Sequence, residues 1–163
     1  KRVVTVQDAL KLWIVCWGGN LLGSVILSYL YNFTGLYKDA TLAAIVGSAA
    51  MKMSLPPLAL FMRGLLCNYL VCLAVWCCFR SKSDSGKLIM VFWCIVIFFT
   101  AGFEHSVANM TILALALINN AGNETISLAG FAYNLLVVTL GNILGGALFV
   151  AVPYFIAAKE VEK

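Results

Sequence analysis

The stretch AGFEHSVANM, Ala101–Met110, places a glutamate, the chain's only histidine, a serine and an asparagine inside a long apolar segment. IMVFWCIVIFFT precedes it and TILALALI follows it. As one straight helix, the whole segment Lys87–Gly122 would measure roughly 54 Å, whereas a bilayer core is about 30 Å thick. We therefore predict a broken helix, with helical parts over Lys87–Phe103 and about Ala108–Asn120. Irregular backbone at membrane depth is tolerated where it is packed in protein or lines a cavity, so this break should line one.

The composition indicates an all-α integral membrane protein. Of the 163 residues, 63% are hydrophobic and 11% are charged, whereas soluble domains carry about 25% charged residues. The small basic excess therefore gives no indication of nucleic-acid binding. The sequence contains no HExxH, GxSxG or phosphate-binding loop, and a single histidine cannot supply a bis-histidine haem site. We expect a protein that is not an enzyme and holds no metal or other cofactor.

Three further stretches are long and apolar enough to cross a membrane. They are Leu12–Tyr31, Leu55–Phe79 and Leu128–Ala158. The intervening stretch Lys38–Met53 is too short and too mixed to span, which favours a surface-lying or re-entrant helix. Ser81–Lys87 is predicted to be a polar loop.

Basic residues indicate the orientation of these four crossings. If both chain ends lie on one side, that side carries eight Lys and Arg residues and the opposite side carries two, with Arg63 inside the membrane. Cytoplasmic loops collect positive charge, so both ends are expected in the cytoplasm. The eight are Lys1, Arg2, Lys11, Arg80, Lys82, Lys87, Lys159 and Lys163; the two are Lys38 and Lys52.

A short motif occurs twice, as GNLLGS at Gly19–Ser24 and as GNILGG at Gly141–Gly146. The two spans that contain it are predicted to run in opposite directions, as in an inverted-topology repeat. Glycines at this spacing also serve ordinary helix packing, and the motif alone does not decide between these readings. If the repeat exists, two elements of its first half have no counterpart in this chain.

His105 is the main candidate for a functional side chain, because ionisable residues within a membrane mark pathways by default. Imidazole can also exchange a proton near neutral pH. Glu104 either faces the pathway or bonds backbone groups freed by the break, and we favour the second role. Ser106 is the expected N-cap of the second half-helix, whose positive end would favour a small anion.

For each of four more side chains, the sequence leaves two possible roles open. Lys52 is either an interfacial lysine or part of an anion-attracting entrance. Asn68 and Asn142 either join helices or line the pathway. Phe98 either packs in the core or forms a hydrophobic gate beside the polar site.

Two stretches resemble a known family. RGLLCNYLVCLAVW, Arg63–Trp76, resembles the second signature of the formate–nitrite transporter family, and AGFEHSVANM resembles that family's broken fifth helix. The resemblance implies an aquaporin-like bundle of six helices per subunit, a homopentamer with one pore per subunit, and formate, nitrite or hydrosulfide as substrates. The four crossings resemble the third to sixth helices, so residues 1–163 are expected to be a single transmembrane domain that lacks the family's first two.

The same resemblance implies roles for individual residues. His105 is similar to the family's central pore histidine, Lys52 to its vestibule lysine and Phe98 to an aromatic residue that lines the constriction. Asn68 matches the signature asparagine, and Asn109 and Asn142 match polar positions near the pore and the helix breaks. We therefore expect a pH-dependent channel or transporter for small monovalent anions and protons in the inner, plasma membrane, with a slight lean toward nitrite and hydrosulfide. The alternatives are a non-transporting membrane scaffold and a neutral-solute channel.

Overall fold

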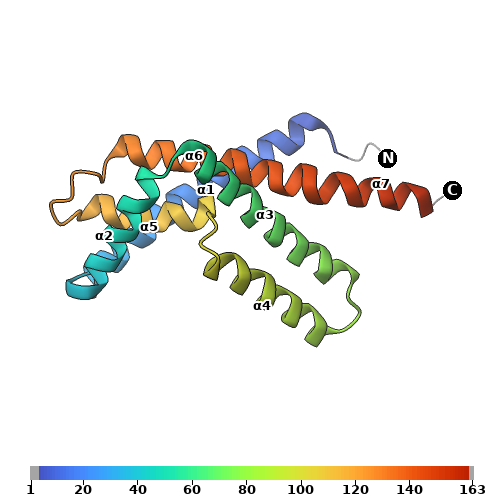
Figure 1. Cartoon of the computed structure of the whole chain (residues 1–163), viewed down its shortest axis with the longest axis horizontal. Helices are drawn as coiled ribbons and strands as arrows, with labels where there is room; N and C mark the ends of the chain where they lie inside the picture. The colour runs from blue at the N-terminus through green and yellow to red at the C-terminus, as the bar shows by residue number, and fades with distance from the viewer. Residues whose placement is uncertain (1–3, 162–163) are drawn as a thin grey trace. The chain divides into compact units, whose positions relative to one another are not determined.

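The computed structural model describes residues 4–161, with side chains described up to residue 158. Within this range the chain is helical and contains no strand, which confirms the predicted all-α fold (Figure 1). The helices are α1 Val6–Phe33, α2 Asp39–Ser54, α3 Pro57–Arg80, α4 Asp84–Thr100, α5 Ser106–Ile118, α6 Leu128–Gly146, the π-helix η1 Ala147–Ala151 and α7 Val152–Val161. Lys1, Arg2 and Lys163, three of the charges that orient the predicted topology, lie outside the described residues.

The helices form two compact units, and each is described by itself. The first contains α1, α2, most of α5 and the start of α6. The second, Leu55–Ser106 together with the chain from Ala132 onward, contains α3, α4, the break before α5, most of α6, η1 and α7. Five of the seven candidate site residues belong to the second unit: Asn68, Phe98, Glu104, His105 and Asn142.

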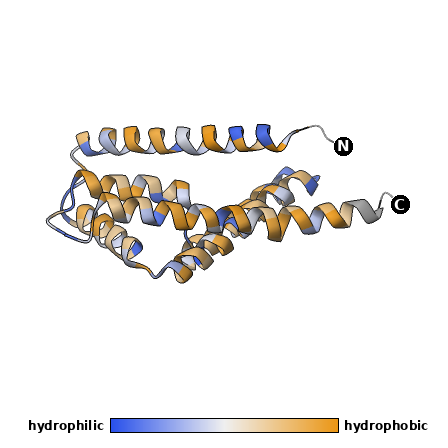
Figure 2. Ribbon diagram, turned by 90° about the horizontal axis from the view of Figure 1, so that it is seen from above, coloured by the Kyte–Doolittle hydropathy of each residue, from blue (hydrophilic) through white to orange (hydrophobic). Residues whose placement is uncertain are grey.

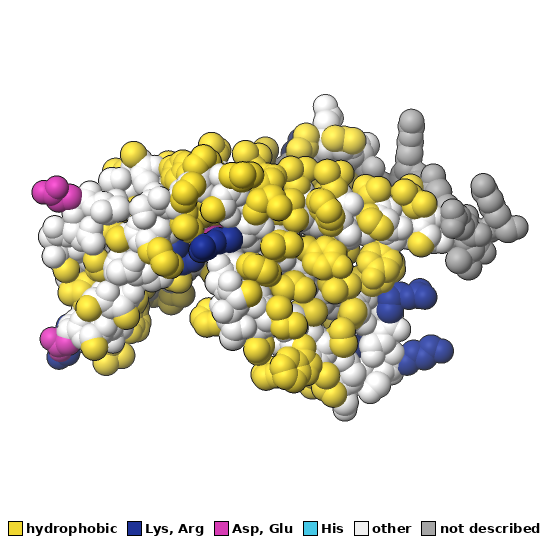
Figure 3. Space-filling view, viewed as in Figure 1, with side chains coloured by type: hydrophobic (Ala, Val, Ile, Leu, Met, Phe, Trp, Pro, Cys, Tyr) yellow, Lys and Arg dark blue, Asp and Glu magenta, His cyan; other side chains and the backbone are white. Residues whose placement is uncertain are grey.

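Three helical stretches among the described residues are long and apolar enough to cross a membrane: Val6–Phe33, Pro57–Arg80 and Leu128–Ala158. They confirm the three spans predicted outside the broken helix. Hydrophobic residues run along most of each helix (Figure 2), and hydrophobic side chains cover much of the face shown in Figure 3. The crossing predicted for the broken helix corresponds to α4 and α5, each of which is shorter than a full span.

The first unit shows how the short helix α2 is held. The Met53 side chain on α2 lies against Gly130, so that a side chain added at this glycine would require Met53 to shift. Tyr37, just before α2, donates its hydroxyl to Asn119 O at 3.1 Å, and Ser28 on α1 donates to Thr111 O at 3.2 Å. The predicted short helix at this position is confirmed, whereas its surface-lying or re-entrant placement stays a prediction.

Local capping sets where the helices begin. The Thr5 hydroxyl oxygen accepts from Asp8 N–H at 3.1 Å, and Asp8 Oδ2 accepts in return from Thr5 N–H at 3.2 Å, which forms a capping box at α1. The predicted polar loop Ser81–Lys87 is wrong in extent. Ser83 Oγ accepts from Gly86 N–H at 3.2 Å and caps α4, so that the helix already begins at Asp84.

In the second unit, glycines bring α6 very close to α3. A side chain at Gly141 or Gly145 would collide with the α3 backbone, at Phe61 O and Leu65 O respectively. A side chain at Gly64 of α3 would in turn lie 2.9 Å from Val138 O of α6. In the other copy of the motif, Gly19 and Gly23 of α1 have no such neighbour within 4 Å. The two copies therefore have different surroundings in the described chain, and the repeat stays a prediction.

Gly145→Ala is expected to destabilise the protein, because its methyl group must displace the backbone carbonyl of Leu65. Overpacking of this kind costs about 1–3 kcal/mol. Thermal unfolding of purified protein in detergent should show a lower midpoint than for the control Gly47→Ala, since nothing lies within 4 Å of the corresponding position on α2. Equal midpoints for the two variants would contradict this account of the packing between α3 and α6.

The last predicted span, Leu128–Ala158, is not a regular α-helix throughout. Its second half contains the π-helix η1, Ala147–Ala151. This segment directly follows Gly145 and Gly146, and glycines weaken the regular helix that they interrupt. Beyond η1, Tyr154 of α7 stacks on Trp76 of α3 with ring centroids 4.4 Å apart.

Candidate functional site

The predicted break in the polar stretch is confirmed, and glycine determines where it begins. Gly102 has φ +69°, a left-handed conformation that favours glycine. Its N–H donates to Phe99 O at 3.2 Å and Phe103 N–H donates to Phe98 O at 3.0 Å. This is a Schellman motif, which ends α4 at Thr100. The predicted end at Phe103 was three residues too late. The left-handed backbone at Gly102 ends the helix, although the stretch up to this point is apolar.

Asn142 of α6 holds the broken segment in place. Its Nδ2 donates to Gly64 O of α3 at 2.8 Å and to Glu104 O in the break at 3.0 Å, while its Oδ1 accepts from Ser106 N–H at 3.0 Å. The side chain is buried, and its amide joins three segments of the chain. Of the two readings left open for Asn142, this geometry supports the joining of helices.

Asn68 extends the same network from α3. Its Nδ2 donates to the backbone carbonyl of Asn142 at 2.6 Å. Because Asn68 lies one turn after Gly64 on α3, the two residues hold α3 to α6 at successive turns. Asn68 is half-buried, whereas Asn142 is buried.

Glu104 is enclosed at the break. Its backbone N–H donates to Arg63 O of α3 at 3.3 Å, its carbonyl accepts from Asn142, and its side chain is only 1% exposed. The backbone of Glu104 thus closes the break against both α3 and α6. Burial of the side chain agrees better with the favoured structural role than with a position in an open pathway.

The beginning of α5 differs from the prediction. The helix starts at Ser106, two residues earlier than expected, so Ser106 is its first helical residue and not its N-cap. The N–H of Ser106 already donates to Asn142 Oδ1. This amide is therefore engaged by a protein side chain, and the anion-binding role expected for the positive end of this half-helix is weakened.

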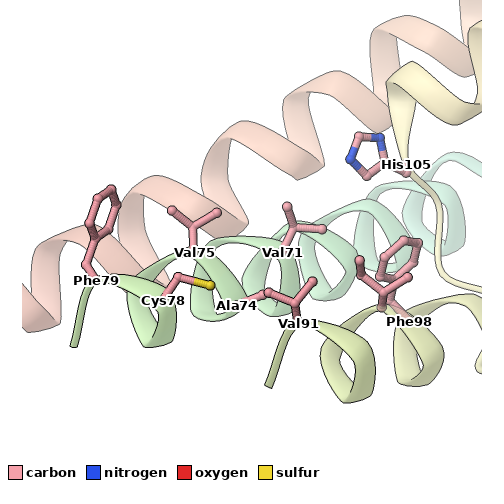
Figure 4. A pocket seen from close by; sticks show the side chains of 9 residues that line it. Val71, Ala74, Val75, Cys78, Phe79, Val91, Phe98 and His105 are labelled. Atoms are coloured by element: carbon pink, nitrogen blue, oxygen red, sulfur yellow. The ribbon is translucent and has the colours of Figure 1, made fainter. Parts of the chain in front are cut away.

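His105 and Phe98 border an apolar cavity of about 330 Å³ in the second unit. Their ring centroids are 6.1 Å apart, and both rings lie at one end of the cavity, with Phe79 at the other (Figure 4). The imidazole is half-buried, and the other lining residues are apolar. The cavity is lined by Val71, Ala74, Val75, Cys78 and Phe79 of α3, Val91, Ile95 and Phe98 of α4, and His105.

Lys52 and Asn109 belong to the first unit. Lys52 is half-buried in the last turn of α2, where a positive charge complements the helix dipole. Asn109 lies in the first turn of α5 and is 1% exposed. The roles of both in a pore stay predictions.

Comparison with known proteins identifies the family. The formate/nitrite transporter family model matches residues 1–156. The chain belongs to the formate/nitrite transporter family. Over 157 residues it is 41% identical to the nitrite transporter NirC of Escherichia coli strain K12, covering 94% of this chain and 58% of NirC. The chain therefore spans somewhat more than half the length of this relative.

Solved structures of the formate/nitrite transporter type have the same fold. An FNT family ion channel superposes with a TM-score of 0.86 at 37% identity, over 94% of this chain and 61% of the channel. A pentameric formate channel with formate bound gives a TM-score of 0.84 at 29% identity, over 96% of this chain and 69% of that channel. With its long apolar helices, this member of the family is a multi-pass membrane protein.

Sequence reasoning missed part of what builds the site. Gly102, which ends α4, carried a readable signal, because glycine is the usual residue just after a helix end. The apolar lining from Val71 to Phe79 carried none, since those residues also match an ordinary membrane helix. Cys78 borders the cavity and likewise had no distinguishing feature in the sequence.

Proposed function

We propose that this protein is a channel or transporter for small monovalent anions, with nitrite, hydrosulfide or formate as substrates. One observation carries the proposal: a broken helix presents His105 and Phe98 together at the end of an apolar cavity. Membership of the family supports it, as do the name of NirC and the formate bound in a structure of the same fold. The family and this geometry also favour transport over catalysis.

His105 would lower the barrier to an anion in one of two ways. A desolvated anion is expensive in apolar surroundings, and the cavity beside His105 is apolar apart from the imidazole. Protonated His105 can act as a counter-charge. It can also donate its proton, so that the neutral acid passes Phe98 and the imidazole is reprotonated from water. The second mode makes flux depend on pH.

The wider assembly belongs to the same proposal. The pentamer seen in the formate channel supports a homopentamer of this protein. The protein would lie in the inner, plasma membrane, and the distribution of Lys and Arg supports a cytoplasmic C-terminus. Residues 1–163 would then supply the last four of six helices of one transmembrane domain.

A direct test measures uptake by liposomes that contain the full-length gene product. Entry of nitrite, formate and hydrosulfide is compared with entry of a neutral solute such as glycerol, at several pH values and against empty liposomes. Selective anion entry supports the proposal. Entry of glycerol alone favours the neutral-solute channel, and entry equal to that of empty liposomes favours the non-transporting scaffold.

Lys52→Gln is expected to reduce anion uptake several-fold at low salt. The reduction should be smaller at about 0.15 M salt, because salt then screens the attraction of this half-buried charge for a distant anion over about 8 Å. The control is Lys38→Gln, which removes an exposed lysine from the same predicted side of the membrane. Salt-dependent uptake should change in the first variant only. Uptake that is indifferent to Lys52 would contradict an anion-attracting role.

A further inference from the structure

Arg63 is a charged residue that the site described above does not use. It lies six positions after Pro57, the first residue of α3, and therefore about 9 Å along an apolar helix. Charged side chains at such positions are rare, usually face the protein interior or a watery cavity, and mark ion pathways. Among the side chains of residues 4–158, no salt bridge joins the Arg63 guanidinium to a carboxylate.

The backbone places Arg63 beside the helix break. Its carbonyl accepts from Glu104 N–H at 3.3 Å, one residue before His105. The next carbonyl, that of Gly64, accepts from Asn142 Nδ2. The break thus lies against α3 at Arg63 and Gly64. The Arg63 side chain is therefore attached to α3 at the position along the helix where the break packs.

Burial along α3 places Arg63 between an exposed stripe and the buried face of this helix. Met62, Leu66 and Tyr69 form that stripe, with 44%, 40% and 37% exposure. The residues one turn before and one turn after Arg63, Leu60 and Cys67, are 0% exposed. Since residues three and four apart share a helix face, Arg63 lies at the border of the buried face and is itself half-buried.

Arg63 would give the break a source of positive charge other than the first amide of α5. The Ser106 N–H is engaged by Asn142 Oδ1, and a guanidinium stays charged throughout the physiological pH range. A fixed charge within a poorly solvated site acts more strongly than the same charge in water. Arg63 is the only basic residue on α3 between its first residue and Arg80 at its end.

We propose that Arg63 supplies a fixed positive charge that draws small monovalent anions to the break at His105. This inference rests on the proposed function and adds an anion-selecting residue to it. Arg63 would raise the local concentration of the anion at all pH values, whereas His105 would act only when protonated. The two residues therefore contribute separately to binding and to the pH dependence of flux.

The test compares Arg63→Gln, Arg63→Lys and the matched control Arg80→Gln in liposomes, each as the full-length gene product. Nitrite and formate influx is measured over a range of concentrations and normalised to the protein that elutes as the wild-type assembly. Arg63→Gln should raise the half-saturating anion concentration about tenfold, equivalent to about 1.4 kcal/mol. Its maximal rate should change less than about twofold, and Arg63→Lys should recover most of the affinity because it keeps the charge. Arg80→Gln should match wild type.

Other outcomes overturn the inference in recognisable ways. An unchanged half-saturating concentration, with loss of co-purified anionic phospholipid measured by mass spectrometry, would assign Arg63 to a lipid phosphate. A lower maximal rate and less assembled protein in both Arg63 variants, with unaltered affinity, would assign it to packing. Absence of anion influx in wild type would instead refute the proposed function itself.

Discussion

Replacement of Asn142 by aspartate is expected to abolish anion flux and to destabilise the protein, although the two side chains have nearly the same shape. An ionised carboxylate only accepts hydrogen bonds. It could still accept from Ser106 N–H, but its second oxygen would face the carbonyls of Gly64 and Glu104, which lie 2.8 and 3.0 Å from Nδ2. A buried charge without compensation costs about 3–5 kcal/mol. Protonation would relieve the charge but leave one O–H for two carbonyls.

The loss of flux follows from the same contacts. Asn142 is bonded to the residues immediately before and after His105, so the imidazole depends on it for its position beside Phe98. Thermal unfolding in detergent and nitrite influx into liposomes would measure the two effects. Asn68→Asp is the matched comparison, since it removes one donated bond from a half-buried side chain. A variant Asn142→Asp with wild-type stability and flux would show that Asn142 does not hold the break.

The sequence predicted the existence of the broken helix but not its boundaries. Segment length against membrane thickness required a break, and the polar residues located it. The end of α4 depends on the left-handed backbone at Gly102, a local signal that could have been read. The start of α5 depends on Asn142, 36 residues along the chain from Ser106. No pattern within the stretch itself reports such a long-range cap.

The same distinction applies to the site residues. His105 and Phe98 could be paired from the sequence, because Phe98 lies just before the break and His105, the chain's only histidine, lies within it. The choice between joining and lining roles for Asn142 required knowledge of its neighbours on α3. Arg63 was conspicuous as an intramembrane charge, but its relation to the break appears only through the hydrogen bond from Glu104. Tertiary contacts thus decide roles that residue type leaves open.

His105→Asn is expected to remove the pH dependence of transport while leaving the assembly intact. If His105 donates a proton to the anion, wild-type influx should fall as the pH rises from about 5 to 8, because protonated imidazole becomes scarcer over that range. Asparagine retains polarity but cannot exchange a proton. At the acidic end, influx in the variant should fall at least about tenfold, equivalent to about 1.4 kcal/mol of barrier.

The shape of the pH profile distinguishes the mechanism from a simple structural defect. Loss of correctly folded protein would scale the whole profile down and preserve its slope, whereas loss of the proton donor flattens it. Phe98→Leu provides the control at the same end of the cavity, because it keeps an apolar side chain beside His105 and should retain the wild-type slope. Influx should therefore be recorded for wild type and both variants, each normalised to assembled protein. If influx in His105→Asn depended on pH as steeply as in wild type, His105 would be excluded as the proton donor. The pH dependence would then arise from ionisation of the substrate itself.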